Sequence, residues 1–233
     1  MEEILGYVSA LDKAVALCVK HTEQLVKKDR DLSLSYFELG QALSAYGTAE
    51  QEGRQPIAAS LFASAGSTAD SLCQLLTASS EAEQVRWLEP LEEAQRFLHS
   101  VKAALQTRQD KRAAYACLVA DVEAKTLAVR KLQGAPGKDS QLRAKETALA
   151  QAQETCDLSK REFDRVTDVF LGEFEAFKLS KAQHLRDTLL AAANLQVDYH
   201  KKAHQAWAEL LPKVEGLGLG QSAPSAPLSG LST

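Results

Sequence analysis

The sequence contains few of the residues that build sheets, tight turns and disulfide frameworks. Aromatic residues make up 6% of its 233 residues, and only twelve glycines and six prolines are present. Ala, Leu, Glu, Gln, Lys and Arg are abundant instead, which favours long helices over a sheet-rich fold. The four cysteines form no CxxC pair, so we expect reduced thiols rather than disulfides or a metal site.

Several function classes lack their sequence signatures. No run of about 18 apolar residues is present, which excludes a membrane-spanning helix. The chain begins with Glu2 and Glu3 rather than a basic region and an apolar run, so we expect no secretory signal. The net charge of −4 argues against nucleic acid as a partner.

Catalytic and cofactor motifs are also missing. The sequence has no glycine-rich phosphate loop, nucleophile elbow or HExxH pattern, so we predict that the protein is not an enzyme and holds no cofactor. His200 and His204 are four residues apart on one helical face, but the five histidines show no metal-ligand pattern. We therefore predict no metal site.

Glycine and proline divide the chain into three expected helical segments. The first covers residues 2–46 and is closed by Gly47 and the polar stretch through Gly53. The second begins at Pro56 and runs to residue 132. Pro90 is expected to bend the second segment, with residues 77–80 and Gly66 as weaker points. A turn at residues 134–137 leads to the third segment, which Pro212 should stop.

Apolar residues recur every seven positions in the first and third segments. Such spacing predicts long helices that coil around one another with a left-handed supercoil. The rows are Ile4, Leu11, Cys18, Leu25, Leu32, Leu39 and Tyr46, with Val8 and Val15 four residues on, and Leu142, Leu149, Cys156, Phe163, Phe170 and Phe177. The second segment carries a less regular row through Leu91, Leu98 and Leu105, interrupted near Arg108 and Arg112.

These patterns predict an all-α, elongated, antiparallel three-helix coiled coil. The start of the first segment is apolar on more than one face, and one hairpin cannot cover all of it. We therefore expect a dimer. The residues expected at its interface are Ile4, Val8, Leu11, Val15, Cys18, Leu25 and Trp207.

The end of the third segment resembles the last helix of BAR domains in retromer-associated sorting nexins. The similar run is RVTDVFLGEFEAFKLSKAQHLRDTLLAAANLQVDYHKKAHQAWAELLPKVE, residues 165–215. Its matching positions are Arg165, Val166, Glu173, Phe177, Leu185, Trp207, Leu210, Leu211 and Pro212. Residues 100–132 and 35–47 resemble the family's second helix and the end of its first, so the resemblance covers residues 1–215. The remaining residues, 216–233, are rich in Gly, Ser and Pro and are expected to be disordered.

The resemblance implies a curved homodimer, or a heterodimer with another sorting nexin, that senses or stabilises membrane curvature. It further implies endosomal sorting and retrograde protein transport, a cytoplasmic protein attached peripherally to endosomes, phosphoinositide-containing membrane as a ligand, and retromer as a candidate partner. Sorting nexins of this class place a phox-homology domain and a short amphipathic helix before the rod, whereas this sequence begins at the rod itself. Whether an upstream domain is missing stays open, and so do the cargo and the lipid selectivity.

Charge distribution gives independent support for a membrane ligand. Residues 100–145 contain ten basic and four acidic side chains, so this stretch carries +6 and the rest of the chain −10. Anionic lipid attracts each nearby Lys or Arg by about 1 kcal/mol. The expected membrane-binding residues are Arg108, Lys111, Arg112, Lys125, Arg130, Lys131, Lys138, Arg143 and Lys145. Of the family's Lys-Lys-Arg cluster, the resemblance matches only Lys125.

One alternative function fits the same pattern. A soluble coiled-coil scaffold or tether would use its apolar row to bind partner helices without touching lipid. Binding to anionic liposomes, and its dependence on salt, distinguishes the two interpretations.

Overall fold

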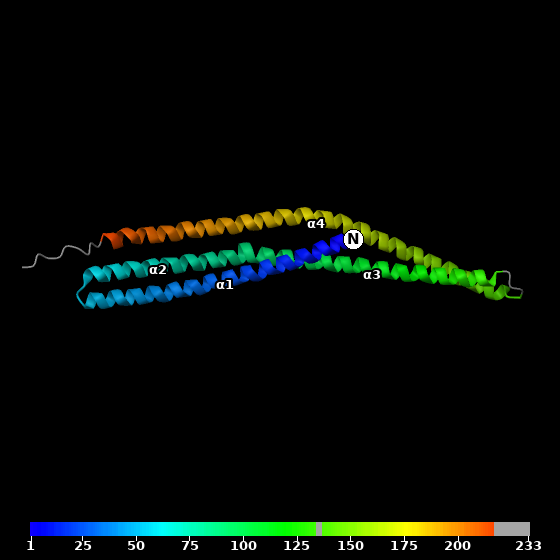
Figure 1. Ribbon diagram of the computed structural model, residues 1–233, viewed down its shortest axis with the longest axis horizontal. Coiled ribbons are helices and arrows are strands. Elements are labelled where there is room, and N and C mark those ends of the chain that lie inside the picture. Colours follow the sequence, from blue (N-terminus) through cyan, green and yellow to red (C-terminus); the bar gives the residue numbers. More distant parts are fainter. Residues whose placement is uncertain (134–136, 217–233) are drawn as a thin grey trace, which may run out of the picture. The chain divides into compact units, whose positions relative to one another are not determined.

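The computed structural model describes residues 1–133 and 137–216, and its regular elements there are all helical. They are α1 (Glu2–Glu52), α2 (Pro56–Glu83), the π-helical turn η1 (Gln84–Leu88), α3 (Glu89–Leu132) and α4 (Asp139–Glu215) (Figure 1). The prediction of an all-α fold is confirmed. None of the described helices combines the length and hydropathy needed to cross a bilayer.

Two helix boundaries agree with the sequence prediction and two do not. α2 begins at Pro56 and α3 ends at Leu132, as expected. The prediction that Gly47 closes the first helix is wrong, since α1 continues to Glu52. Pro212 does not stop α4, because the helix closes one further turn with a 2.9 Å bond from the Gly216 N–H to the Pro212 carbonyl.

The expected turn lies partly outside the described residues. Gly134 and Pro136 are not described, and neither are residues 217–233, on which most of the predicted tail falls. Gly137 has a φ of 78°, a left-handed conformation that a residue without Cβ adopts at little cost. This glycine therefore has the role in the turn that its position suggested.

The irregularity in the second segment is the π-helical turn that precedes Pro90. A proline lacks the N–H that would donate to the carbonyl four residues earlier, and its ring clashes with that carbonyl. The wider π-helical turn at Gln84–Leu88 lies just ahead of Pro90, where the hydrogen bond is missing and the ring would clash. α3 then continues from Glu89. Gly66 and residues 77–80, the weaker points, stay inside α2.

The chain divides into two units that share α1 and α4. Unit 1 comprises Met1–Lys20 and Glu89–Thr188, and unit 2 comprises His21–Leu88 and the chain from Leu189 onward. Each unit therefore packs part of α1, part of α4 and one further helical stretch: α3 in unit 1, and α2 with η1 in unit 2.

Large apolar side chains form the core of unit 1. Val8 and Val15 of α1 meet Leu98 and Leu105 of α3 and Phe170, Phe174 and Phe177 of α4. Contacts between α3 and α4 run in opposite directions along the two helices, from Pro90 with His184 to Arg108 with Thr167. This antiparallel seven-residue packing agrees with the predicted rows on α3 and α4.

Small residues dominate where α1 and α2 meet in unit 2. A Cβ on Gly66 would lie 3.1 Å from the Gly40 carbonyl oxygen, and a Cβ on Gly47 would lie 3.0 Å from that of Ala59. Glycine is required at these positions because the two backbones approach closely, which explains why Gly47 lies inside a helix. The residues around Gly40 and Gly66 thus act as a helix contact rather than as breaks.

This close contact sets which face of α1 is buried. The buried positions are Thr22, Val26, Ser33, Gly40 and Gly47. The predicted row continues through Leu25, Leu32, Leu39 and Tyr46, which remain 44 to 51% exposed. The period of seven is therefore correct, but in unit 2 the predicted row lies beside the buried face and not on it.

Replacing Gly66 by leucine should force α1 and α2 apart. We expect a loss of about 1–3 kcal/mol in the free energy of unfolding, because the new side chain meets the Gly40 backbone. Urea denaturation followed by circular dichroism measures the change.

Gly172→Leu is the matched control. A Cβ at Gly172 has no atom within 4 Å, so this variant should keep or slightly raise stability through better helix propensity. Equal destabilisation of both variants would contradict the close-packing explanation.

Candidate membrane and partner surfaces

Beyond the core of unit 1, α3 and α4 continue as a pair. α1 begins near Phe170 and Leu105, so from residue 106 onward α3 has only α4 beside it in this unit (Figure 1). We call residues 106–132 and 139–169 the arm. All nine predicted membrane-binding residues lie on the arm or at the turn that joins its two helices.

Three of those nine residues are engaged within the arm. The Arg108 guanidinium lies 5.0 Å from the centre of the Phe163 ring, and its Nε donates a 3.0 Å hydrogen bond to Thr167 Oγ1. Lys111 pairs with Glu162 at 3.6 Å, and Lys125 pairs with Asp121 one turn earlier on α3. The contacts of Arg108 and Lys111 join α3 to α4, and all three contacts direct the cations toward protein groups.

Glu162 links two basic residues on the arm. It receives two bonds from the Arg165 guanidinium, at 2.9 and 3.0 Å, and it faces Lys111. The hydrogen bonds from Arg165 are the largest cause that lowers the pKa of Glu162 below its ordinary value. The carboxylate therefore stays charged and neutralises part of the basic surplus on this side.

Five other basic residues gather around the turn between α3 and α4 and are exposed. Among the described residues, none of the five has an ion pair or a side-chain hydrogen bond. We call them the tip cluster: Arg130, Lys131, Lys138, Arg143 and Lys145. Arg112, the ninth predicted residue, is also exposed but lies further back on α3. Asp139 is the sole acidic residue between positions 130 and 145, so the cluster keeps a net positive charge.

The residues predicted at a dimer interface divide into two groups. Val8 and Val15 are 1% and 6% exposed inside the core of unit 1, with Ile4 and Leu11 packed against that core. This differs from the expectation that they face a second chain, because α3 and α4 already cover them. Cys18, Leu25 and Trp207 are exposed and remain available to a partner.

An exposed apolar row on unit 2 extends the available part of the predicted interface. We call Leu25, Leu32, Leu39 and Tyr46 the partner stripe. On α4 of the same unit, Trp207, Leu211 and Val214 are 47, 56 and 45% exposed. The sequence rows contained the stripe residues, but placing them at the surface required the packing of α1 on α2.

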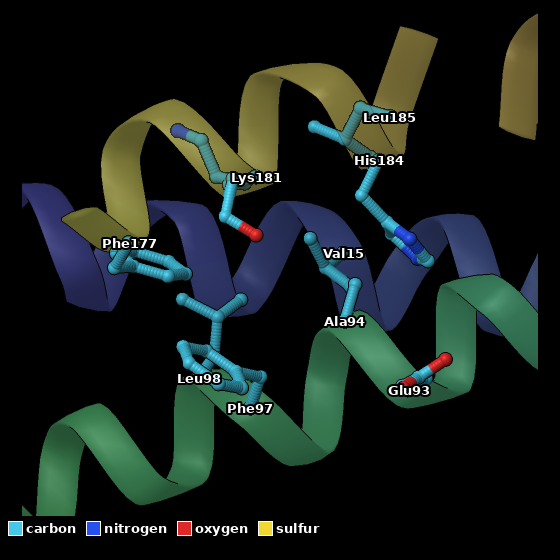
Figure 2. Close-up of a pocket in the computed structure, with 10 residues that line it drawn as sticks. Val15, Glu93, Ala94, Phe97, Leu98, Phe177, Lys181, His184 and Leu185 are labelled. Atoms are coloured by element: carbon cyan, nitrogen blue, oxygen red, sulfur yellow. The ribbon is translucent and has the colours of Figure 1, made fainter. Parts of the chain in front are cut away.

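A cleft with a volume of about 200 Å³ lies in unit 1 where α1, α3 and α4 meet. Phe97, Leu98, Phe177 and Val15 line it (Figure 2). Its polar side chains already contact the protein: Lys181 bonds the Tyr7 hydroxyl, and His184 Nε2 lies 3.0 Å from the Pro90 carbonyl oxygen. In the described part of the chain, no three His, Cys, Asp or Glu side chains are grouped to bind a metal.

Comparison with known proteins identifies the family. The model of the family described as Vps5 C-terminal-like matches residues 1–213. The chain belongs to this family. Sorting nexin 1 of Arabidopsis thaliana is 22% identical over 92% of the chain, and the chain spans about half of that relative, 52% of its length.

A solved structure supports the same fold. The F-BAR domain of Hof1p superposes with a TM-score of 0.56 at 12% identity, covering 90% of this chain and 87% of that one. The chain is thus a sorting-nexin type of BAR domain, and the resemblance seen in residues 165–215 is confirmed.

Arg108 should contribute to stability of the BAR arm through its contacts with Phe163 and Thr167. We expect Arg108→Ala to lower the free energy of unfolding by about 1–2 kcal/mol, the usual value of a cation–π contact with a hydrogen bond. Thermal and urea denaturation measure it. Arg112→Ala, which removes an exposed arginine four residues away, should change stability by much less, and a larger loss there would argue against this assignment.

Proposed function

We propose that this chain is a peripheral membrane module that binds anionic lipid as a dimer and senses or stabilises membrane curvature. The observation that carries the proposal is the tip cluster: five exposed basic side chains with no ion pair among the described residues. Its place on the arm of a sorting-nexin type of BAR domain supports lipid as the ligand.

The strength of the lipid contact follows from charge. Each Lys or Arg near an anionic surface contributes about 1 kcal/mol, and the attraction weakens as salt shortens the screening length. Two chains in one dimer present two tip clusters, so the second contact gains from a high effective concentration. Weak individual contacts thereby give salt-sensitive binding.

The partner stripe supports dimerisation through unit 2. Its four large apolar side chains at seven-residue spacing are of the kind that another helical bundle covers, and Trp207 and Leu211 on α4 are exposed as well. Water is removed from these side chains when a second copy, or a related sorting nexin, packs against them. We therefore place the interface at Leu25, Leu32, Leu39 and Trp207 rather than at Val8 and Val15.

The family membership supports a cellular role in endosomal sorting. We propose retrograde protein transport as the process, the cytoplasmic face of endosomal membranes as the location, and phosphoinositide-containing bilayers as the lipid ligand. Retromer is a proposed partner, and the domain is proposed to extend over residues 1–215. The role is that of a non-enzymatic scaffold, in which shape and charge, rather than bond chemistry, do the work.

Reversing the charge of the tip cluster should remove membrane binding. In the variant Arg130→Glu, Lys131→Glu and Arg143→Glu we expect affinity for anionic liposomes to fall by roughly a hundredfold or more, since three attractive contacts become repulsive. Liposome co-sedimentation at two salt concentrations measures the loss, while circular dichroism should show unchanged helicity.

Lys13→Glu, Lys20→Glu and Lys27→Glu provide the charge-matched control. These exposed lysines lie on α1 and do not belong to the arm, so their reversal should retain most of the binding. An equal loss in both triple variants would indicate general charge attraction. Wild-type protein that ignores anionic liposomes at low salt would favour the scaffold or tether function instead.

Polar substitutions in the partner stripe should dissociate the dimer. We expect Leu25→Gln, Leu32→Gln and Leu39→Gln together to weaken self-association at least a hundredfold, because buried apolar area is lost while the internal core of unit 2 is untouched. Sedimentation velocity over a range of concentrations measures the change.

Leu127→Gln and Leu158→Gln form the control pair on the arm. Both leucines are more than half exposed, and both lie outside the proposed interface. The control should sediment like the wild type. A stripe variant that remains dimeric would refute this location of the interface.

A further inference from the structure

Unit 2 contains a buried carboxyl group for which neither membrane binding nor dimerisation gives a use. Glu83, at the end of α2, is 1% exposed. Its Oε1 accepts a 2.5 Å hydrogen bond from Gln196 Nε2 of α4 and a 3.4 Å bond from Ser79 Oγ. Within the described residues, its Oε2 has no hydrogen-bond partner.

A second carboxyl group faces Glu83 from α1. Asp29 lies within hydrogen-bonding reach, and its negative charge acts directly on Glu83. No basic side chain among the described residues forms an ion pair with either carboxyl. Arg30, the neighbour of Asp29 on α1, donates a 3.4 Å bond to Gln84 Oε1 instead.

The other groups around the two carboxyls are an amide and two phenols, none of which carries a positive charge. Gln196 and Tyr199 approach from α4, and Tyr36 from α1. Burial, followed by Tyr36, Asp29 and Glu83, raises the pKa of Tyr199, so its hydroxyl stays protonated at neutral pH. Asp29 is only partly buried, but its carboxylate repels the buried carboxylate of Glu83 when no counter-ion is present, and a proton on Glu83 removes most of that repulsion.

We propose that Glu83 keeps its proton in the folded chain and directs it toward Asp29, so that the two residues act as a pH-sensitive clasp between α1 and α2 of unit 2. This proton supplies a hydrogen-bond donor between two groups that otherwise have only acceptors. When the proton leaves, the buried negative charge of Glu83, directly before η1, faces the negative charge of Asp29. The middle of α1 and the end of α2, which meet there, then separate more readily.

The working range of the clasp lies near neutral pH. Burial first, and then Asp29, raises the pKa of Glu83 from 4.5 to about 7. The folded chain therefore keeps its proton up to about pH 7, while the unfolded chain releases it near pH 4.5. Stability contributed by the proton is complete below pH 4.5 and is lost as the pH rises through 7.

Glu83→Gln tests the clasp because an amide imitates the protonated acid. Its oxygen accepts from Gln196 and Ser79, and its NH₂ donates toward Asp29. We expect the unfolding temperature of the variant to exceed that of the wild type by an amount that grows by roughly 5 °C from pH 5 to pH 8. A gap that does not change with pH would overturn the proposal.

Two further variants separate the pair from general effects of charge. Glu81→Gln removes an exposed carboxyl two residues away and should leave the wild-type pH profile unchanged. Asp29→Asn removes the facing charge and should move the loss of stability to lower pH. If Asp29→Asn retains the full wild-type profile, Asp29 does not act on the proton of Glu83 and the proposal fails.

Hydrogen exchange locates the effect, and a chelator excludes a metal. After correction for intrinsic rates, amides of residues 25–36 and 76–88 should exchange faster at pH 8 than at pH 6, while those of the unit 1 core should not. EDTA should leave the wild-type profile unchanged. A pH dependence that EDTA abolishes would mean that the carboxyls bind a cation, which would overturn the proposed proton on Glu83.

The clasp also bears on self-association, and this consequence rests on the proposed function. Asp29 lies on α1 between Leu25 and Leu32 of the partner stripe, so loosening of α1 should weaken the dimer at pH 8 in the wild type but not in Glu83→Gln. The unfolding and exchange experiments do not require a dimer. A monomeric protein with the expected unfolding profile would refute the proposed interface and leave the clasp standing.

Discussion

Close packing of α1 against α2 determines which side of α1 is left for another chain. The backbones meet at Gly40, Gly47 and Gly66, where a Cβ would approach a backbone oxygen to between 3.0 and 3.3 Å. Small residues on the buried face allow this approach and leave the leucines of the partner stripe outside. The orientation of α1 about its own axis therefore determines both its contact with α2 and the face that is left for the proposed dimer interface.

The two units use α1 in different ways. In unit 1, Val8 and Val15 fill a core with three phenylalanines of α4, so apolar volume supplies the packing. In unit 2, Gly40, Ser33 and Thr22 face inward, and the large side chains lie at the flank. A helix with such an uncovered apolar flank is a natural site for association, whereas the unit 1 section is already covered by its own chain.

The basic residues of the arm fall into two groups: some contact other protein groups, and others are exposed to solvent. Arg108, Lys111 and Lys125 contact Phe163, Glu162 and Asp121, and these contacts stabilise a pair of helices with few buried residues. The tip cluster has no such partners among the described residues, which leaves its charge available to an anionic surface. Unit 2 shows the opposite arrangement at Glu83, where a carboxyl group is buried without a cation.

Much of the fold could be predicted from the sequence, because helix boundaries and apolar rows depend on residues close together in the chain. Pro56 and Leu132 mark true helix boundaries, and the apolar rows on α3 and α4 through Leu98, Leu105, Phe170 and Phe177 are buried as expected. Glycine was misread at positions 47 and 66, because a glycine that ends a helix and one that permits close helix contact look the same in a sequence. The pairing of Asp29 with Glu83, 54 positions apart, likewise left no periodic signal.

The sequence by itself determined the helices, their seven-residue period, the family and the basic surplus near the turn, because each depends on residue type and spacing along one chain. Tertiary structure decided the rotation of α1, and with it which leucines are exposed. It also decided which of the nine arm cations are held by a neighbour and where two carboxyls meet. These features depend on distances between segments remote in sequence, which only packing fixes.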